Sequence, residues 1–387
     1  MRLEQLRSTG GPTISALDQK TAATTAMKGG GYYSQSTRGA KDVIDNASSM
    51  LIDAVAALPA PQNGRPINIA DYGAADGGTS KKSIRDTVAA LRGRFTNQQI
   101  LVTYTDLASN DFSTLFKSMQ GLDGDADNTY YNEFDGVFVH ACGIGFHRQL
   151  IPDGSLSLGF SATAMHYISE KPCEIPDHVH MVGASGAALQ AYADRAAKDW
   201  ENILLARANE LVSGGRLVFM NFGKDEQGRY LGGTDGIDMF DTFDSLWKEL
   251  AAEGRITQDE YVNASFSQFY RTKEEFSAPL LDTASPVHAA GLRLISAHTG
   301  VVKCPYRAAF EAANGAMSAR EFAVSYIPTL RSWSETVFAT ALDRGRPADE
   351  RAAIVDDFFQ RYEDRVATNP DGHAMDYVHC YLAIEKV

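Results

Sequence analysis

Short apolar runs alternate with segments of helical spacing through the first 224 residues of this chain. The apolar runs, which are typical of β-strands, cover residues 67–71, 100–104, 134–141, 155–160 and 216–221. Helical spacing of apolar side chains covers residues 41–58, 83–95 and 189–211. Strands and helices that alternate along a chain form a mostly parallel sheet with helices on both faces. The pattern therefore predicts an α/β fold.

The rest of the chain is mostly helical in pattern. We interpret residues 225–291 as an α-helical cap over the sheet, joined by part of 308–342. Two apolar segments, 292–302 and 377–384, are expected to close the sheet. The predicted organisation is a flexible N-terminal arm at 1–26, an α/β domain made of 27–224 and 292–387, and the cap.

Charge and composition exclude several classes of protein. The formal net charge of −13 argues against a nucleic-acid partner, because phosphate binding normally needs a basic face. No stretch approaches the ~18 apolar residues that span a bilayer. The first 27 residues also lack the uninterrupted apolar core of a secretory signal. These features predict a cytoplasmic protein with no membrane partner.

The cysteine and histidine patterns predict no metal ion. The four cysteines are scattered without a C-x-x-C pair, which argues against a disulfide frame or a structural zinc site. His178 and His180 form an H-x-H pair, but no third ligand lies near them in the sequence. We therefore expect reduced thiols and no metal site.

A glycine-rich turn follows the first predicted strand. Asp71, Gly73 and Gly77 give the spacing D-x-G-x-x-x-G just before a predicted helix. Such a turn lets a ligand approach the backbone closely. The dinucleotide pattern G-x-G-x-x-G, which seats a pyrophosphate, is absent here. A leading carboxylate suits a ligand that carries an ammonium group, such as S-adenosylmethionine (SAM), although glycine-rich turns also occur in ordinary loops.

A second acid, Asp106, follows the next predicted strand at residues 100–104. A carboxylate at this position can accept hydrogen bonds from both hydroxyls of a ribose. Either acid alone is a weak signal. Two acids at consecutive strand ends favour a bound nucleoside over an ordinary loop.

A third cluster covers residues 161–169, immediately after the fourth predicted strand. His166 and Tyr167 can each donate a hydrogen bond to an anion, and the Tyr167 ring can form a pocket wall. A packed helix start with a hydrogen-bonded His166 accounts for the same residues. The pattern alone leaves both interpretations open.

Taken together, these segments resemble the SABATH family of SAM-dependent carboxyl and N-methyltransferases. The resemblance rests on residues 27–33, 69–73, 106–112 and 161–169, and it continues through 252–256 to the C-terminal strand. It implies a Rossmann-like, seven-stranded SAM-dependent methyltransferase domain with an α-helical cap, commonly as a homodimer. It also implies transfer of a methyl group from SAM to the carboxylate of a small, aromatic or hydrophobic acid, which leaves S-adenosylhomocysteine (SAH).

The resemblance implies roles for individual residues. Asp71 and Gly73 would lie against the methionine part of SAM, and Asp106 would hold the ribose. His166 and Tyr167 would grip the substrate carboxylate and act as the catalytic pair. The remaining cofactor-binding positions that the resemblance implies are Tyr33, Thr79, Leu107, Gly145, Phe146, Ser161 and Ala162.

The chain departs from the family pattern at several of these positions. Thr79 stands where an Asn is usual, and Gly145 lacks a serine hydroxyl beside the adenosine. Thr163, a predicted substrate-binding residue, replaces a common pocket tyrosine, and Ala40 occupies a position that is often Gln. Tyr167 replaces a larger Trp. These departures concern the substrate more than the cofactor.

Aromatic and thioether side chains of the helical segments are further pocket candidates. We expect Met239, Phe240, Phe243 and Trp333 to bind the substrate, and Trp247 to lie in the cap core. Three alternatives stay open at this point: N-methylation of a small heterocycle, a nicotinamide-dependent oxidoreductase, and a non-catalytic protein that binds SAM or a small acid.

Overall fold

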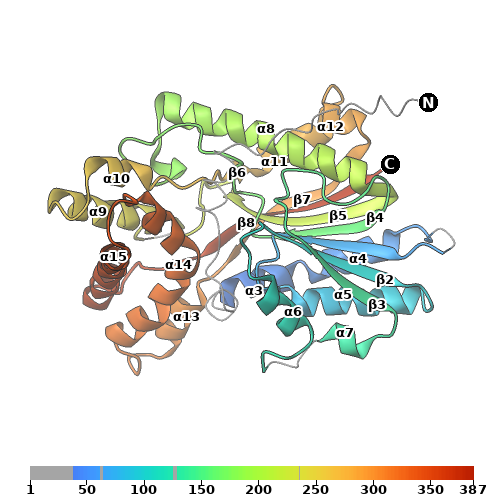
Figure 1. Cartoon of the computed structure of the whole chain (residues 1–387), viewed down its shortest axis with the longest axis horizontal. Coiled ribbons are helices and arrows are strands. Elements are labelled where there is room, and N and C mark those ends of the chain that lie inside the picture. The colour runs from blue at the N-terminus through green and yellow to red at the C-terminus, as the bar shows by residue number, and fades with distance from the viewer. Residues whose placement is uncertain (1–37, 62–63, 125–128, 235) are drawn as a thin grey trace, which may run out of the picture.

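A mixed sheet forms the centre of this protein in a computed structural model that describes residues 38–61, 64–124, 129–234 and 236–387. The strands follow the order β3-β2-β1-β4-β5-β8-β7 across the sheet, and a short β6 pairs with β5 (Figure 1). Their bounds are β1 (Ile67–Tyr72), β2 (Ile100–Thr105), β3 (Val137–Cys142), β4 (Leu156–Ala162), β5 (Leu211–Lys224), β6 (Arg271–Thr272), β7 (Leu292–Val302) and β8 (Tyr377–Lys386). The predicted α/β fold is confirmed.

The chain reverses its direction of travel across the sheet between β3 and β4. Strands β1, β2 and β3 follow one another toward one edge of the sheet. The next strand, β4, pairs in parallel with β1 on the opposite side from β2. Strand β8 runs antiparallel to its neighbours β5 and β7. Open α/β sheets bind ligands at the carboxyl ends of the strands beside such a switch point. The carboxyl ends of β1 and β4 are therefore the place to look for a site.

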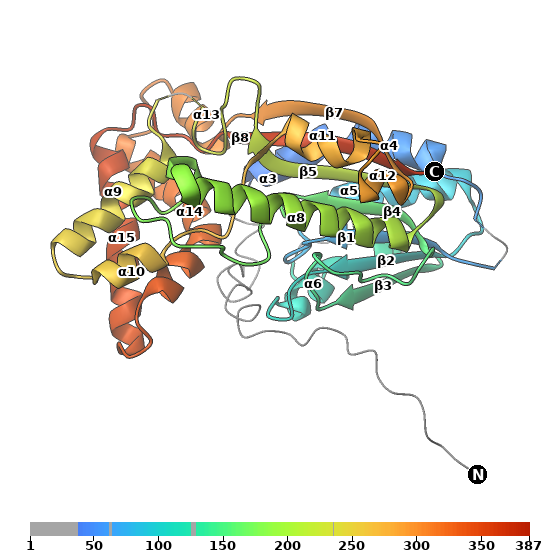
Figure 2. The same ribbon diagram turned by 90° about the horizontal axis from the view of Figure 1, so that it is seen from above.

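Helices cover both faces of the sheet. On one face lie α3 (Arg38–Asn46), α4 (Ser48–Ala57) and α5 (Lys81–Arg94), followed by α6 (Phe112–Met119) and α7 (Tyr130–Glu133). On the other face, α8 (Gly186–Glu210) runs the length of the sheet with α11 (Lys273–Leu281) and α12 (Pro286–Ala289) beside it (Figures 1 and 2). Within the described residues, no helix is both long and apolar enough to cross a bilayer.

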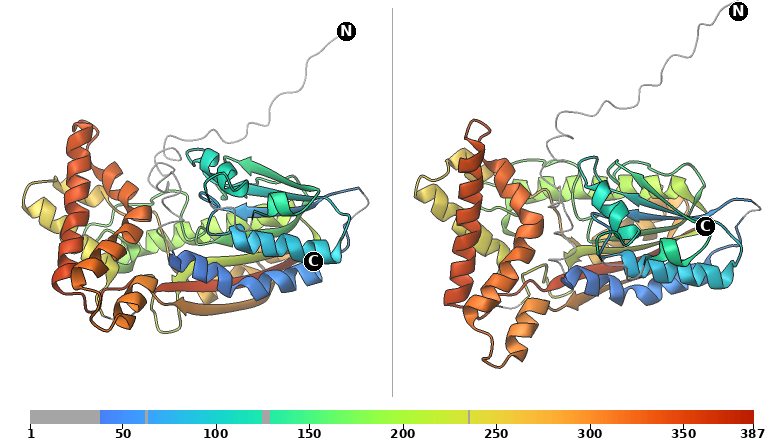
Figure 3. Two further views of the ribbon diagram at one scale, coloured as in Figure 1. Left: turned by 90° about the horizontal axis from the view of Figure 1, so that it is seen from below. Right: turned by 60° about the horizontal axis from the view of Figure 1, so that its bottom comes forward.

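A cluster of helices lies at one end of the sheet and forms the cap (Figure 3). Its members are α9 (Met239–Ala252), α10 (Gln258–Asn263), α13 (Pro305–Ala312), α14 (Ala319–Ala341) and α15 (Ala348–Thr368). Reciprocal capping boxes at Thr257 and Ser318 begin α10 and α14. Each such cap satisfies backbone N–H groups that the first helical turn leaves without partners.

Aromatic side chains fill the interior of the cap. Trp247 is fully buried, and its ring centroid lies 5.0 Å from Phe338 and 5.3 Å from Phe358. Burying one side chain of this size contributes about 1.5–3 kcal/mol of hydrophobic free energy. The packing confirms the expectation that Trp247 belongs to the cap core.

Three helices pack differently from the predicted division of the chain. Helices α11 and α12 fall within the predicted cap, but they pack against α8 and β7 on a face of the sheet. Helix α15 falls within the predicted α/β domain, but it packs against α9 and α14 in the cap. Helical spacing identifies an apolar face, and the layer against which that face packs depends on contacts between residues far apart in the sequence.

Candidate functional site

The turn after β1 is held close to the end of β2. The backbone N–H groups of Gly73 and Ala74 donate to the carbonyl oxygen of Thr105 at 2.8 and 3.1 Å. Gly73 has a φ of +80°, and a Cβ added there would lie 2.4 Å from the Cβ of Ala164. Only glycine fits this conformation and this approach. The turn therefore brings the end of β1 against the segment that follows β4.

Asp71 is a buried carboxylate at the start of this turn. The hydroxyl of Ser80 donates to its Oδ2 at 2.6 Å, and the side chain is 2% exposed. Burial raises the pKa of Asp71 to about 7, the Ser80 hydrogen bond opposes that rise, and the negative charge of Asp106 adds to it. In the part of the chain that the structure describes, no cationic side chain pairs with Asp71. An ammonium group is the kind of ligand group with which such a buried carboxylate pairs favourably.

Asp106 connects the glycine-rich turn to the end of β2. Its Oδ2 accepts the N–H of Ala75 and its Oδ1 accepts the N–H of Leu107, both at 2.7 Å. Burial raises the pKa of Asp106, whereas these two backbone hydrogen bonds lower it. A carboxylate has about four lone-pair positions, so two stay available for hydroxyl groups of a ligand. The structure thus brings the two predicted acids to neighbouring positions.

Leu107, Gly145 and Phe146 gather beside the same turn. A Cβ added to Gly145 would lie 3.3 Å from Cδ2 of Leu107, and one added to Gly73 would lie 3.9 Å from Cε1 of Phe146. Leu107, Gly145 and Phe146 are half-buried. Three of the predicted cofactor residues therefore form one apolar surface next to Asp71 and Asp106.

The other predicted cofactor residues have varied environments. Thr79 is half-buried in the turn before α5, and Ala162 is half-buried at the end of β4. Ser161 is fully buried, and its hydroxyl donates to the carbonyl oxygen of Tyr72 at 2.8 Å. This hydrogen bond links β4 to β1. Tyr33 lies outside the described residues, as does the predicted arm at 1–26.

The predicted substrate pair follows β4 directly. His166 is buried, and its ring centroid lies 4.5 Å from that of Tyr167 and 4.9 Å from that of Phe222. Burial and the charges of nearby groups hold the pKa of His166 well below its usual range, so the imidazole is neutral at pH 7. Its Nδ1 has no hydrogen-bond partner among the residues described. A neutral imidazole in this setting can donate to a carboxylate without adding a charge.

The backbone around His166 is fixed from both sides. The N–H of Met165 donates to Oδ1 of Asn221 at 3.1 Å, and the carbonyl of Met165 accepts from Nη1 of Arg271 at 3.2 Å. The carbonyl of Tyr167 accepts from Nε2 of His147 at 3.3 Å. These bonds make the 165–167 segment rigid, as precise positioning of a reactant requires.

Thr163 lies beside His379, a residue that the sequence did not single out. Thr163 has a φ of +58°, and its N–H donates to the carbonyl of Met220 at 2.7 Å. Its hydroxyl lies 3.2 Å from Nε2 of His379. His379 reaches the site because β5 and β8 pair with Phe222 opposite His379. The sequence predicts the closing strand as an apolar run, but it does not predict which residues of β5 and β8 lie opposite each other.

Histidines 178 and 180 form hydrogen bonds and ring contacts within the protein. His178 Nε2 lies 3.1 Å from Oδ1 of Asp241, and His180 Nε2 lies 3.3 Å from Oε1 of Gln268. The His180 ring stacks on Phe240 with a centroid separation of 3.8 Å. Across the described ranges, no three His, Cys, Asp or Glu side chains are grouped as metal ligands.

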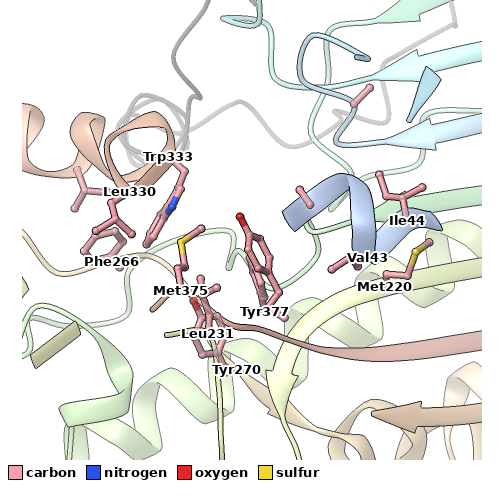
Figure 4. Packing of buried hydrophobic residues seen from close by; sticks show 14 of the residues in the cluster. Val43, Ile44, Met220, Leu231, Phe266, Tyr270, Leu330, Trp333, Met375 and Tyr377 are labelled. Atoms are coloured by element: carbon pink, nitrogen blue, oxygen red, sulfur yellow. The ribbon is translucent and has the colours of Figure 1, made fainter. Parts of the chain in front are cut away.

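The predicted cap-side pocket residues are buried in one aromatic group. Met239, Phe240 and Phe243 are fully buried, and Trp333 lies 6.2 Å from Phe240 and 6.0 Å from Phe243. Figure 4 shows Trp333 on the cap side and Tyr377 between it and α3.

Phe243 contacts the interior of the cap. Its ring centroid lies 5.5 Å from Phe338, 5.9 Å from Phe358 and 5.4 Å from Tyr362. Phe240 instead bridges Trp333 and His180. The two predicted pocket rings thus have different neighbours: Phe240 contacts Trp333 and His180, and Phe243 contacts the cap core.

A separate hollow of about 450 Å³ lies away from these residues. Pro59, Asn68, Phe95 and Val212 are among its lining residues, which places it at the amino ends of the strands. None of the predicted site residues lines this hollow. The arrangement at the carboxyl ends is therefore the candidate functional site.

Comparison with known proteins gives a family match over most of the chain. Residues 22–387 match the family model described as SAM dependent carboxyl methyltransferase. Gibberellic acid methyltransferase 1 of Arabidopsis thaliana is 27% identical over 238 residues, which cover 55% of this chain and 61% of that protein. Farnesoic acid carboxyl-O-methyltransferase of the same plant is 27% identical over 210 residues, or 50% of this chain and 56% of that protein. The chain thus matches only about 60% of the length of these relatives.

A solved structure has a similar fold. Loganic acid methyltransferase with SAH matches with a TM-score of 0.71 at 21% identity, covering 93% of this chain and 98% of that one. The sheet and cap described above therefore recur together in a protein of related fold.

Proposed function

Because this chain belongs to the SABATH family of SAM-dependent carboxyl methyltransferases, we propose that it transfers a methyl group from SAM to the carboxylate of a small organic acid. The products are a methyl ester and SAH. The observation that carries the proposal is that a buried acid, Asp71, and a half-buried acid, Asp106, lie beside the segment that bears His166 and Tyr167.

The chemistry of the site fits SAM better than a dinucleotide. Buried carboxylates repel a pyrophosphate, whereas they attract an ammonium group and accept from ribose hydroxyls. The raised pKa of Asp71 agrees with a carboxylate that has no cationic partner among the described residues. In this proposal Asp71 and Gly73 hold the amino-acid end and Asp106 the ribose. Leu107 and Phe146 would lie against the adenine, with Tyr33, Thr79, Gly145, Ser161 and Ala162 completing the cofactor site.

When bound, SAM supplies a methyl group activated by a sulfonium charge. A carboxylic acid has an unperturbed pKa near ~4, so the acceptor is already ionised at neutral pH and needs no general base. The residues that touch it have to remove water and hold one oxygen in line with the methyl group. Positioning of this kind can lower a barrier by about 7–11 kcal/mol.

We assign the carboxylate to His166 and Tyr167. His166 is neutral because burial lowers its pKa. Opposite charges disappear as the ester forms, so a fixed cation here would stabilise the reactants more than the transition state. A neutral donor avoids that penalty.

The substrate that suits these walls is aromatic or hydrophobic. In this proposal Trp333 and Phe240 supply aromatic walls, Met239 and Thr163 are further contacts, and Phe243 supports Phe240 from within the cap. Aromatic pairs contribute about 0.5–1.5 kcal/mol beyond the area they bury. We further propose that the protein is a cytoplasmic homodimer, without nucleic-acid, membrane or metal partners.

A methyl-transfer assay tests the proposed reaction. Purified full-length chain is incubated with labelled SAM and panels of aromatic and aliphatic acids and of nitrogen heterocycles. We expect a methyl ester as the product. It is identified when treatment with alkali releases the label as methanol. A product on nitrogen that resists alkali would assign N-methylation instead, and binding of NAD without SAM would favour an oxidoreductase.

A further inference from the structure

A buried ion pair contacts two segments of the candidate cofactor site, at Tyr72 and at Phe146. Arg207 and Glu210, near the end of α8, are both fully buried. Nε of Arg207 donates to Oε2 of Glu210 and Nη2 donates to Oε1, each at 2.6 Å. Two parallel bonds of this kind fix both the distance and the orientation of the pair.

Both partners also hold the loop that follows β3. Arg207 donates through Nη1 to the carbonyl of Phe146 at 2.8 Å and through Nη2 to the carbonyl of Arg148 at 2.7 Å. Oε1 of Glu210 accepts the N–H groups of Leu150 and Ile151 at 2.6 and 3.1 Å. Four backbone groups within six residues therefore depend on a single ion pair.

The same pair reaches the end of β1. The hydroxyl of Tyr72 donates to Oε2 of Glu210 at 2.5 Å, and the guanidinium of Arg207 lies 4.2 Å from the centroid of the Tyr72 ring. Tyr72 stands between Asp71 and Gly73 in the chain. Its carbonyl also accepts the hydroxyl of Ser161, so β4 is tied to the same point.

We infer that Arg207 and Glu210 are positioning residues for the cofactor site, through the three segments that they hold in register. This inference rests on the proposed function, because it assumes that SAM lies against Asp71, Phe146 and Asp106. Neither side chain reaches the ligand surface, since both are fully buried. Their effect passes through Tyr72 and the 146–151 loop.

A second ion pair, in the cap, provides a control, with Glu260 buried and Arg346 half-buried. Arg346 donates through Nε and Nη2 to Glu260 at 2.6 and 2.8 Å. Glu260 also accepts two backbone N–H groups, those of Asp343 and Thr257. The pair has the same chemistry as Arg207 with Glu210, but it joins α10 to the loop after α14.

The test measures SAH binding by calorimetry on the full-length chain and on the variants Arg207→Lys, Tyr72→Phe and Arg346→Lys. Lysine keeps the charge but cannot reach both carbonyls and both carboxylate oxygens together. We expect the dissociation constant of SAH to rise roughly tenfold in Arg207→Lys and about threefold in Tyr72→Phe, and to stay within about twofold of wild type in Arg346→Lys.

Kinetics separate positioning from general destabilisation. With an acid that the panel shows to be methylated, KM for SAM should rise in Tyr72→Phe while kcat changes by less than about twofold. Equal losses of SAH affinity in Arg207→Lys and Arg346→Lys would overturn the inference. If Arg207→Lys does not fold, unchanged SAH affinity in Tyr72→Phe overturns it. Failure of the wild-type chain to bind SAH would instead reject the proposed cofactor site.

Discussion

Asp71 combines a buried position with a pKa near neutrality, so its charge depends on pH in the range where enzymes are assayed. Burial raises its pKa to about 7, which means that the free protein carries this carboxylate largely protonated at pH 6 and ionised at pH 8. A ligand ammonium group selects the ionised form. Cofactor affinity should therefore rise as pH rises through 7.

Calorimetric titration with SAH at pH 6 and pH 8 checks this expectation. Wild-type affinity should be roughly tenfold higher at pH 8, since the ionised fraction of a group with this pKa changes by about that factor. Asp71→Asn should bind SAH at least about tenfold more weakly at pH 8 and lose most of the pH dependence. An Asp71→Asn variant that keeps the wild-type affinity and pH profile would contradict the role given to this carboxylate.

His166 should affect turnover much more than cofactor binding. We expect His166→Ala to lower kcat about 10²-fold, because the carboxylate loses a positioned donor, and to leave SAH affinity within about twofold. Since the histidine is already neutral, kcat of the wild type should show no step from its titration between pH 6.5 and 8.5. Collapse of SAH affinity in His166→Ala would show that the site is not divided in this way.

At the scale of elements, the glycine-rich turn after β1 has little conformational freedom at Gly73. Gly73→Ala places a methyl group 2.4 Å from Ala164 in a backbone conformation with φ of +80°. We expect a loss of about 2–4 kcal/mol in the free energy of unfolding, from overpacking and backbone strain together.

Gly64→Ala separates these two contributions. Gly64 has a nearly equal φ of +77°, but a Cβ there would have nothing within 4 Å. Its expected cost is about 1–2 kcal/mol, from the backbone conformation alone. Urea unfolding of both variants measures the difference, and equal losses would show that the contact between Gly73 and Ala164 contributes nothing.

How far the sequence predicts each element depends on how local its signals are. The ends of β1 and β2, with Asp71 and Asp106, were predictable because strand, acid and glycine lie within a few residues. The packing of α11, α12 and α15 was not, because an apolar helix face does not specify its neighbour. His379 and Arg207 were missed for the same reason, since their roles depend on strand register and on contacts across 59 to 216 residues.

At the scale of the whole molecule, buried histidines make stability depend on pH. Burial lowers the pKa of five histidines: His147, His166, His180, His373 to about 4, and His379 to about 3. Each is neutral when folded and takes up a proton on unfolding below pH 6.5. Asp71 acts in the opposite sense, because its folded pKa is raised and unfolding releases its proton.

Asp106 and Asp238, whose pKa values are also raised, act in the same sense as Asp71. The five histidines outnumber these three carboxylates, so stability should fall as pH drops from 6.5 toward 4. Each histidine contributes at most about 1.4 kcal/mol per pH unit in that window. Urea unfolding at pH 7.5 and pH 5.5 measures the change, and His379→Asn should reduce it. Equal free energies of unfolding at the two pH values would contradict the assignment of these histidines as buried and neutral.

The most direct test of the central claim is a crystal structure of the full-length chain with SAH and an aromatic acid. The account predicts that Asp106 accepts from the ribose hydroxyls and Asp71 lies against the amino group, with the acid carboxylate at His166 and Tyr167 facing the sulfur. A structure in which SAH binds elsewhere, or in which Asp106 faces away from the ribose, would contradict it.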